Sequence, residues 1–260
     1  MRTSQRVFVT GSAGRIGQVV VAELVRRGHD VVGYDVRPTP GLPAQQANLG
    51  TVTDAQMLRQ AAKGSSVIIH LAATADDVAF PRPDPPHDID NFLSDLVPNN
   101  LIGSYHVMET ARVLAIPRVI LASTGQVIDG HLQAGHYPVT PDTPPIPRYL
   151  YACTKVFLEA LGQVYSRHHG IHVLAVRLGW CPRDSQQVEA IRRSELAQDV
   201  YLSPNDAGRV FAAAVEAASL PPFAIVYATS RPLHVCRYDL SVTRHLLQWE
   251  PWEQWPQGIM

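Results

Sequence analysis

The sequence predicts an α/β fold built on a doubly wound parallel sheet. Short apolar runs alternate with amphipathic helical stretches along the 260 residues, and this alternation places helices on both faces of a sheet. Two runs, at 66–71 and 118–123, are apolar almost throughout, as strands covered on both faces are. A glycine-rich turn joins the first run to the first helix. The length suits one large domain, 1–260.

The first strand–helix–strand unit predicts what the domain binds. Its turn follows strand 7–9, and its second strand ends in Asp35. Glycines let a backbone approach a pyrophosphate closely, while the helix N-terminus offers free N–H groups and partial positive charge. A carboxylate after the second strand accepts hydrogen bonds from a ribose. The unit therefore predicts a Rossmann-type dinucleotide site, against the alternative of a purely structural turn. Its glycines are Gly11, Gly14 and Gly17.

Composition and charge narrow the function classes. Hydrophobic residues make up 46% and charged residues 17%, which suits a globular chain with a sizeable core. The formal net charge is −1, and no block of like charge predicts a nucleic-acid or membrane partner. Cys153, Cys181 and Cys236 are odd in number and unsuited in spacing to a metal, so we expect no metal and a reducing, cytoplasmic compartment. We also expect no signal peptide and no membrane span.

The rest of the chain continues the alternation. We expect strands at 66–71, 118–123, 172–178 and 223–228. Proline-rich loops are expected at 38–43 and 130–147. Ser203 should cap the helix that Pro204 begins. The helices are expected at 54–63, 99–114, 149–168, 185–198, 203–218 and 239–247.

Two segments lack a regular pattern. Residues 75–98 are rich in proline and aspartate, and long loops of this kind are often functional. The alternative is a solvated loop with a short helix at 90–96, and the aspartates have no spacing that suits a metal. The chain ends on Trp249, Trp252 and Trp255, which we interpret as packing over the core rather than as a binding platform.

A tyrosine and a lysine on the predicted helix 149–168 indicate chemistry. Tyr151 and Lys155 are four residues apart, so they share a helix face. A nearby ammonium favours the phenolate, and we expect the pKa of Tyr151 to be lowered towards the working pH, which would make it a general base. Ser123 strengthens the pair, because strand ends in a parallel sheet line the ligand crevice.

Together these motifs resemble the extended short-chain dehydrogenase/reductase superfamily, the NAD-dependent epimerase/dehydratase family. The motifs are TGSAGRIG at 10–17, Asp35, HLAA at 70–73, Asn100, Ser123 and Tyr151-x-x-x-Lys155. Within it the chain is most similar to the uronate dehydrogenases, through ASTGQVIDG at 122–130, PDTPPIPRYLYACTKVFLEAL at 141–161, VRLGWC at 176–181 and YLSPND at 201–206. The resemblance implies that 1–178 is mainly the NAD-binding part and 179–260 a small substrate-binding part.

The resemblance also implies residue roles. Asp35 would hold the adenosine ribose and select NAD over NADP, although Arg37 could partner a 2′-phosphate. Tyr151 would take the proton of a sugar hydroxyl while hydride leaves the same carbon, with Lys155 tuning it and Ser123 binding the reacting oxygen. In uronate dehydrogenases that carbon is C1 of a free hexuronic acid, and the product is a lactone. The remaining cofactor contacts would be Gly11, Ala13, Gly14, Arg15, Ile16, Gly17, Asn48, Leu49, Leu71, Ala72, Ala73, Asn100, Tyr151 and Lys155.

On the substrate side the chain departs from the family. Ala75 stands where a serine is usual, Thr124 where an asparagine follows the catalytic serine, and Trp180 where a serine is usual. The same reaction on a different sugar is therefore expected, with a hexuronate or a sulfonated hexose such as sulfoquinovose as substrate. Arg183 lies in the segment expected to bind the sugar's anion. The expected substrate contacts are Ala75, Ser123, Thr124, Trp180, Arg192 and Arg193.

Two other functions stay open. A nucleotide-sugar epimerase or dehydratase is disfavoured by the short C-terminal half and by the lack of a carboxylate beside Thr124. A non-catalytic NAD-sensing protein would not need Ser123, Tyr151 and Lys155. In this superfamily, dimers pair helices that resemble 99–114 and 149–168, so the resemblance also implies a homo-oligomer.

Overall fold

The computed structural model describes residues 4–75 and 91–259, and it confirms the doubly wound parallel sheet. Seven strands lie in the order β3-β2-β1-β4-β5-β6-β7, and every pair is parallel. The order reverses at β1 and β4, where sheets of this kind leave a ligand crevice beyond their carboxyl ends. The strands are β1 (Arg6–Thr10), β2 (Asp30–Asp35), β3 (Ala47–Leu49), β4 (Val67–His70), β5 (Arg118–Thr124), β6 (His172–Leu178) and β7 (Phe223–Ala228).

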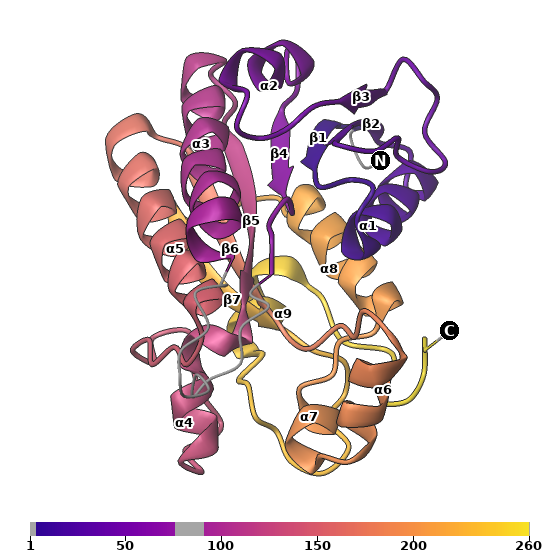
Figure 1. The fold of residues 1–260 in the computed structure, drawn as a ribbon, viewed down its shortest axis with the longest axis vertical. Coiled ribbons are helices and arrows are strands. Elements are labelled where there is room, and N and C mark those ends of the chain that lie inside the picture. Colours follow the sequence, from indigo (N-terminus) through magenta and orange to yellow (C-terminus); the bar gives the residue numbers. More distant parts are fainter. Residues whose placement is uncertain (1–3, 76–90, 260) are drawn as a thin grey trace.

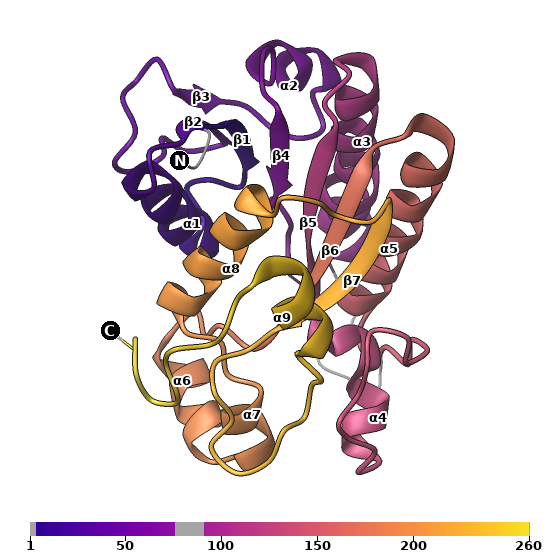
Figure 2. The same ribbon diagram turned by 180° about the vertical axis from the view of Figure 1, so that it is seen from behind.

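Helices cover both faces of the sheet (Figures 1 and 2). One face packs against α2 (Ala55–Ala61), α3 (Gly103–Val113) and α5 (Leu150–His169). The other face packs against α1 (Arg15–Arg26), α8 (Pro204–Glu216) and α9 (Ser241–Leu247). The region after 178 thus supplies β7 and α8 to the same sheet architecture. Outside the layers lie α4 (Asp129–Gln133), α6 (Ser185–Arg192) and α7 (Glu195–Asp199).

The core has two layers, because the central strands bury both faces. In β1, Val7 and Val9 belong to the hydrophobic cluster under α1 and α8, whereas Phe8 belongs to the cluster under α2 and α3. All three side chains are fully buried. This explains why the strands read as continuous apolar runs rather than as an alternation.

The expected helices at 90–96 and 99–114 form one continuous helical segment. Its first part, η1 (Phe92–Ile102), is a π-helix that contains Pro98, and α3 continues from Gly103. The amide N–H of Leu96 reaches the carbonyl of Asn91, and that of Gly103 reaches the carbonyl of Pro98, five residues back in each case. Proline cannot donate to an α-helical ladder, and π turns accommodate such interruptions. Residues 76–90 of the expected loop lie outside the described residues.

Two further boundaries differ from the prediction. The helix expected at 185–198 is two helices, because Ser194 accepts a hydrogen bond from the Ala197 N–H and starts α7. The edge strand β3, a 3-10 turn η2 (Gly125–Ile128) and α4 were not predicted. The start of α8 is confirmed: Ser203 caps it, accepting from the Asp206 N–H, and Pro204 begins it.

The C-terminal segment packs over the core, as predicted, through two of its three tryptophans. Trp249 and Trp255 are buried, whereas Trp252 is 68% exposed. Cys153, Cys181 and Cys236 are free thiols. Among the helices of the described parts of the chain, none combines the length and apolar character that a bilayer crossing requires.

Candidate active site

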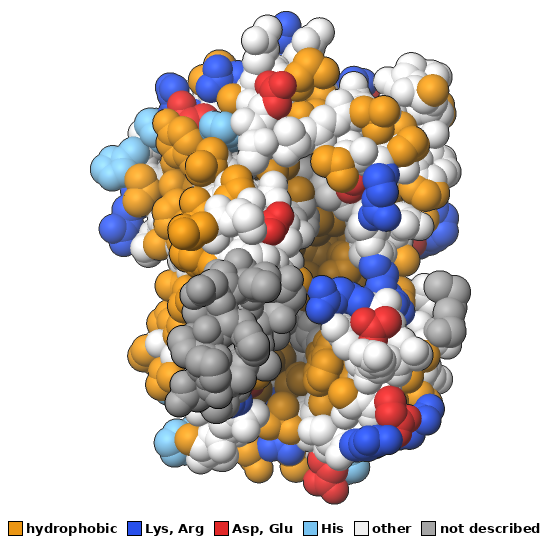
Figure 3. Space-filling model, viewed as in Figure 1, with side chains coloured by type: hydrophobic (Ala, Val, Ile, Leu, Met, Phe, Trp, Pro, Cys, Tyr) orange, Lys and Arg blue, Asp and Glu red, His pale blue; other side chains and the backbone are white. Residues whose placement is uncertain are grey.

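The site residues gather at the carboxyl edge of the sheet. The ends of β1, β4, β5 and β6 meet there, and the N-termini of α1 and α5 point to the same edge. Figure 3 shows the surface hollowed in the middle of this view, with Lys and Arg side chains beside the hollow. An anionic ligand is favoured by such surroundings.

The glycine turn after β1 forms a cradle that side chains would fill. Gly11 has φ +71°, and a Cβ there would come within 2.6 Å of the Ala72 nitrogen. A Cβ on Gly17 would collide with the Gly11 carbonyl oxygen. Gly14 is the N-cap of α1 and has no side chain to cap it, so the first N–H groups of α1 stay available to a pyrophosphate. The cradle fits the dinucleotide that the sequence predicts.

Asp35, the last residue of β2, is hydrogen-bonded to the same glycine turn. Asp35 accepts hydrogen bonds from the Ala13 N–H at 3.0 Å and the Arg37 N–H at 3.1 Å. The Arg37 guanidinium donates to the Ala13 carbonyl at 3.4 Å. A cation therefore lies next to the carboxylate at the place where an adenosine ribose would be held.

The other expected cofactor residues surround the crevice. Asn48 and Leu49 lie on β3 beside Asp35, and Leu71, Ala72 and Ala73 follow β4, with the Leu71 N–H on the Thr10 carbonyl. Arg15 and Ile16 begin α1. Arg15 also donates a hydrogen bond to the Cys181 thiol, whose pKa is raised by burial, so it links the glycine turn to the loop after β6.

Asn100 ties the π-helix η1 to α5. Its amide donates to the Thr74 carbonyl at 2.9 Å and to Thr154 Oγ at 3.1 Å, and its oxygen accepts from the Thr74 N–H at 2.8 Å. Thr154 Oγ donates to the Tyr151 carbonyl at 2.7 Å. The buried Asn100 amide thus positions the first turn of α5. The cofactor contact that the resemblance implies for Asn100 stays a prediction.

The reacting groups expected from the sequence meet at the ends of β5 and α5. Lys155 Nζ donates to the Ala122 carbonyl at 2.8 Å and lies 5.4 Å from the centroid of the Tyr151 ring. Ser123, which follows Ala122 in β5, is 2% exposed. A phenol, an ammonium and a hydroxyl therefore stand at one edge of the sheet.

The expected pKa of Tyr151 is wrong for the chain alone. Burial raises the pKa of Tyr151 to about 12, and the charge of Arg183 only partly opposes this. Burial also lowers the pKa of Lys155 to about 8, against the charge of Glu159. Desolvation disfavours every charged form, and the sequence pattern that places the two residues together does not show how deeply they are buried.

His70 ends β4 as a neutral, fully buried side chain. Burial, and then the charge of Lys155, lower its pKa to about 3. Its ring nitrogens contact Thr10 Oγ at 2.8 Å and Ser104 Oγ at 3.3 Å. His70 therefore joins β1 to α3 as a structural group and carries no charge at neutral pH.

A buried ion pair behind Ser123 was not expected from the sequence. Glu159 and Arg177 face each other through two hydrogen bonds of 2.9 Å, and Ser123 Oγ donates to Glu159 Oε1 at 2.6 Å. Arg177 also donates to the Tyr227 hydroxyl at 2.9 Å. The signal that could have found it is a charged residue inside the apolar strand 172–178.

Three of the expected substrate residues end or follow the strands β4, β5 and β6, which are neighbours in the sheet. Ala75 follows β4, with its carbonyl bound by the Asn91 side chain. Thr124 ends β5 and accepts from the Gln126 N–H at 3.3 Å, so it caps the next turn. Trp180 follows β6, donates to Gln187 Oε1 at 3.3 Å and pairs with Tyr201.

The two adjacent arginines of α6 have exposed side chains. Arg192 and Arg193 both pair with Glu189, and their side chains are 66% and 76% exposed. This is the arrangement of a solvated helix face, and it does not support the substrate role expected for them. Arg183, in the loop between β6 and α6, is the arginine of this segment whose charge acts on Tyr151. Among the described residues no cluster of three or more His, Cys, Asp or Glu could hold a metal.

Comparison with known proteins agrees with this geometry. The chain is 33% identical to L-arabinose 1-dehydrogenase (NAD(P)(+)) of Haloferax volcanii over 230 residues, which cover 83% of this chain and 84% of that protein. It is 29% identical to uronate dehydrogenase of Agrobacterium fabrum, over 68% of this chain and 62% of that one. The crystal structure of uronate dehydrogenase from Agrobacterium tumefaciens superposes with a TM-score of 0.73 at 25% identity, covering 96% of this chain and 85% of the other.

An NAD-dependent oxidoreductase is the class that the fold, the glycine cradle and the Ser–Tyr–Lys group define. The chain belongs to the NAD-dependent epimerase/dehydratase family, whose model matches residues 7–180. This confirms the resemblance found in the sequence motifs.

Proposed function

We propose that the protein oxidises C1 of a free aldose to the corresponding lactone. The observation that carries the proposal is the group Ser123, Tyr151 and Lys155 at the sheet edge beside the glycine cradle. Two similar proteins support it, because one is named an L-arabinose 1-dehydrogenase and the other a uronate dehydrogenase. NAD, when bound, supplies the nicotinamide ring that accepts a hydride.

The chain's own residues would handle the proton. Tyr151 accepts the proton of the C1 hydroxyl, and the cations Lys155 and Arg183 favour the phenolate that this requires. Ser123 lies near the end of β5 beside this pair, and because its own hydrogen is donated to Glu159 it would take part as an acceptor for a hydroxyl of the sugar. Positioning of a hydroxyl and a base in one geometry lowers the entropic barrier of the step.

An acidic sugar is the proposed substrate class, with Arg183 as the partner of its anion. Arg183 is exposed in the loop that follows β6, and its charge reaches Tyr151. A guanidinium suits carboxylate or sulfonate in a bidentate geometry. A hexuronate or a sulfonated hexose such as sulfoquinovose is therefore favoured over a neutral pentose. In this proposal 179–260 supplies most of the substrate side.

An aldose panel tests the proposal. Purified protein with NAD is given L-arabinose, glucose, glucose 6-phosphate, hexuronates and sulfoquinovose, and NADH absorbance is followed. We expect NADH with at least one free aldose, and a higher kcat/KM for acidic sugars. Arg183→Gln should raise KM for the acidic sugar by about tenfold and leave the KM of a neutral aldose unchanged, while kcat falls for both because Tyr151 loses a supporting cation. Interconversion of a nucleotide sugar without net NADH, and no NADH from any aldose, would overturn the proposal.

We also propose a homodimer in the cytoplasm, formed through α3 and α5. Both helices carry exposed apolar side chains on the outside of the sheet layer, which a second copy would cover. Phe157→Glu should convert the dimer to a monomer in light scattering, and a wild-type monomer would contradict the proposal. The free thiols support a reducing compartment. The apolar side chains are Ile102, Tyr105 and Val113 on η1 and α3, and Phe157 and Val164 on α5.

A further inference from the structure

The buried ion pair behind Ser123 has no part in the proton step described above. Glu159 is 5% exposed and Arg177 is 1% exposed. A buried ion pair gives no assured gain in stability over well-packed apolar residues, because both charges must leave water. Its place in the molecule is therefore better explained by what the carboxylate touches.

The Glu159 carboxylate contacts Ser123 and lies on the helix face of Lys155. Ser123 Oγ donates its hydrogen to Glu159 Oε1 at 2.6 Å. Lys155 stands one helical turn before Glu159 on α5, so the two side chains share a face. Arg177 donates to both carboxylate oxygens, which fixes the orientation of the carboxylate. One anion thus anchors the hydroxyl and faces the ammonium.

Lys155 needs an anion nearby because it is buried. Burial lowers its pKa to about 8, and the charge of Glu159 is what opposes the loss of the proton. Two other titratable groups face it: Tyr151, whose ring centroid is 5.4 Å from Nζ, and His70, which burial keeps neutral. Neither supplies a negative charge at neutral pH.

We propose that Glu159, fixed by Arg177, is a positioning residue of the active site that anchors the Ser123 hydroxyl and keeps Lys155 protonated during turnover. The inference rests on the proposed function, because Ser123 and Lys155 are reacting neighbours only in a dehydrogenase. Glu159 acts through these two residues and not on the sugar.

The variant Glu159→Gln tests the proposal, because it removes the charge and keeps the size of the side chain. Loss of a nearby opposite charge should lower the pKa of Lys155 by about one unit. The alkaline limb of the kcat/KM profile against pH should move by the same amount to lower pH, which is about a tenfold loss of activity at a given pH on that limb. A variant that loses activity equally at every pH would overturn the proposal.

Two controls separate the charge from other effects. Asp206→Asn removes a buried, arginine-paired carboxylate on α8, which covers the face of the sheet opposite to α5 with Lys155, and its pH profile should match the wild type. Ser123→Ala removes the hydroxyl and keeps the anion, so its rate should fall while the alkaline limb stays in place. A limb that shifts in either control would mean that Glu159 has no special role.

A measurement without turnover keeps this inference distinct from the proposed function. The nitrogen chemical shift of the Lys155 side chain, followed by NMR of the NAD-free protein with isotope-labelled lysine over a pH series, reports the Lys155 pKa without any reagent having to reach this buried group. We expect a lower pKa in Glu159→Gln by about one unit. Equal pKa values in the two proteins would overturn the inference, whatever the activity. A shifted pKa in a protein that makes no NADH from any aldose would sink only the proposed function.

A second variant covers the case in which Glu159→Gln does not fold. The double variant Glu159→Gln, Arg177→Met leaves no unpaired buried charge, and paired replacement of this kind is tolerated in other proteins. It should show a Lys155 pKa that is lowered by less than in Glu159→Gln, since the supporting carboxylate is lost together with the cation that is paired with it. An unchanged pKa in the double variant would contradict the proposal.

Discussion

Two buried carboxylates, Glu159 and Asp206, are built alike and placed differently. Each pairs with an arginine and accepts a hydrogen bond from a serine hydroxyl. Glu159 lies behind the reacting groups, whereas Asp206 lies in the first turn of α8 under the C-terminal segment. Their partners are Arg177 and Ser123 for Glu159, and Arg209 and Ser230 for Asp206.

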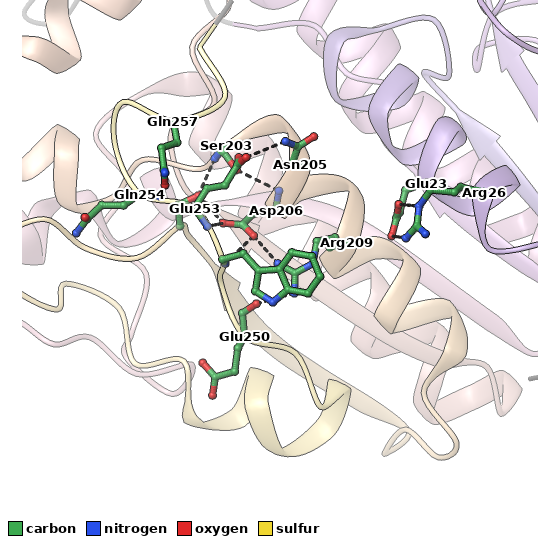
Figure 4. Close-up of polar contacts among 12 residues, drawn as sticks. Glu23, Arg26, Ser203, Asn205, Asp206, Arg209, Glu250, Glu253, Gln254 and Gln257 are labelled. Carbon is green, nitrogen blue, oxygen red and sulfur yellow. Dashed lines mark hydrogen bonds and ion pairs between the residues drawn. The ribbon is translucent and has the colours of Figure 1, made fainter.

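The remaining contacts show what each carboxylate does. Asp206 accepts the backbone N–H groups of Trp252 and Glu253 at 2.9 and 3.1 Å, and the Arg209 guanidinium lies 3.5 Å from the centroid of the Trp252 ring. Figure 4 shows Asp206 between Arg209 and the segment that carries Glu253. The same chemical unit therefore docks a chain segment in one place and supports reacting groups in the other. The neighbours, and not the carboxylate, decide the role.

The largest effect is expected on kcat, from a change in the reacting groups that lie near Glu159. Tyr151→Phe removes the proton base and should lower kcat by about a thousandfold. NAD affinity, measured by calorimetry, should change little, because the glycine cradle and Asp35 are untouched. Loss of NAD binding in this variant would mean that Tyr151 is a structural residue.

Loss of the Asp206 carboxylate, which holds the C-terminal segment, should lower the free energy of unfolding. Asp206→Asn leaves Arg209 without its anion and should cost about 3 kcal/mol of the free energy of unfolding, which lowers Tm by about 10 °C in a chain of this size. The kcat of the folded fraction should stay at the wild-type value. Calorimetry together with activity below Tm checks this, and a large fall in kcat at unchanged Tm would reverse the assignment.

Asp35 is a third carboxylate, placed beside the glycine turn, and we expect its charge to favour NAD over NADP. Asp35→Ala removes the repulsion of a 2′-phosphate and should shift the ratio of kcat/KM for NAD to that for NADP by about tenfold towards NADP. Arg37→Ala, the matched control, should shift the ratio the other way. Ratios that do not move in either variant would leave both residues without the assigned role.

An effect confined to acid pH concerns the buried neutral His70. Its pKa of about 3 lies below the ordinary value near 6.5, so the unfolded chain binds a proton that the folded chain does not. Stability from this group is complete above about pH 6.5 and falls by about 1.4 kcal/mol for each pH unit between 6.5 and 3. His70→Asn should flatten the acid side of a plot of Tm against pH. An equal slope in the variant would assign the acid sensitivity to other groups.

Local patterns predicted the cofactor end of the site. The glycine turn, the strand before it and Asp35 lie within one short stretch, and each has a backbone or charge requirement that few residue types meet. The Ser123, Tyr151 and Lys155 group was found for a similar reason, because strand ends and helix spacing place them together. Chemistry that depends on sequence neighbours can be predicted in this way.

The Glu159–Arg177 pair and the Tyr151 pKa depend instead on the assembled structure. The two charges lie on different elements, and their partnership exists only once α5 packs on β6. The pKa values follow from burial, which the residue pattern does not report. The exposure of the two arginines of α6 depends on the assembled structure in the same way, since the residue pattern does not show which side of a helix faces solvent.

The most direct test of the account follows the hydrogen at C1. An acidic aldose found in the panel is prepared with deuterium at C1 and oxidised with NAD, and the reduced cofactor and the product are analysed by mass spectrometry. The account predicts one deuterium in each reduced cofactor, a lactone as product and a slower rate than with the unlabelled sugar when the chemical step limits turnover. Unlabelled NADH, or deuterium retained at C1 of the product, would contradict oxidation at C1.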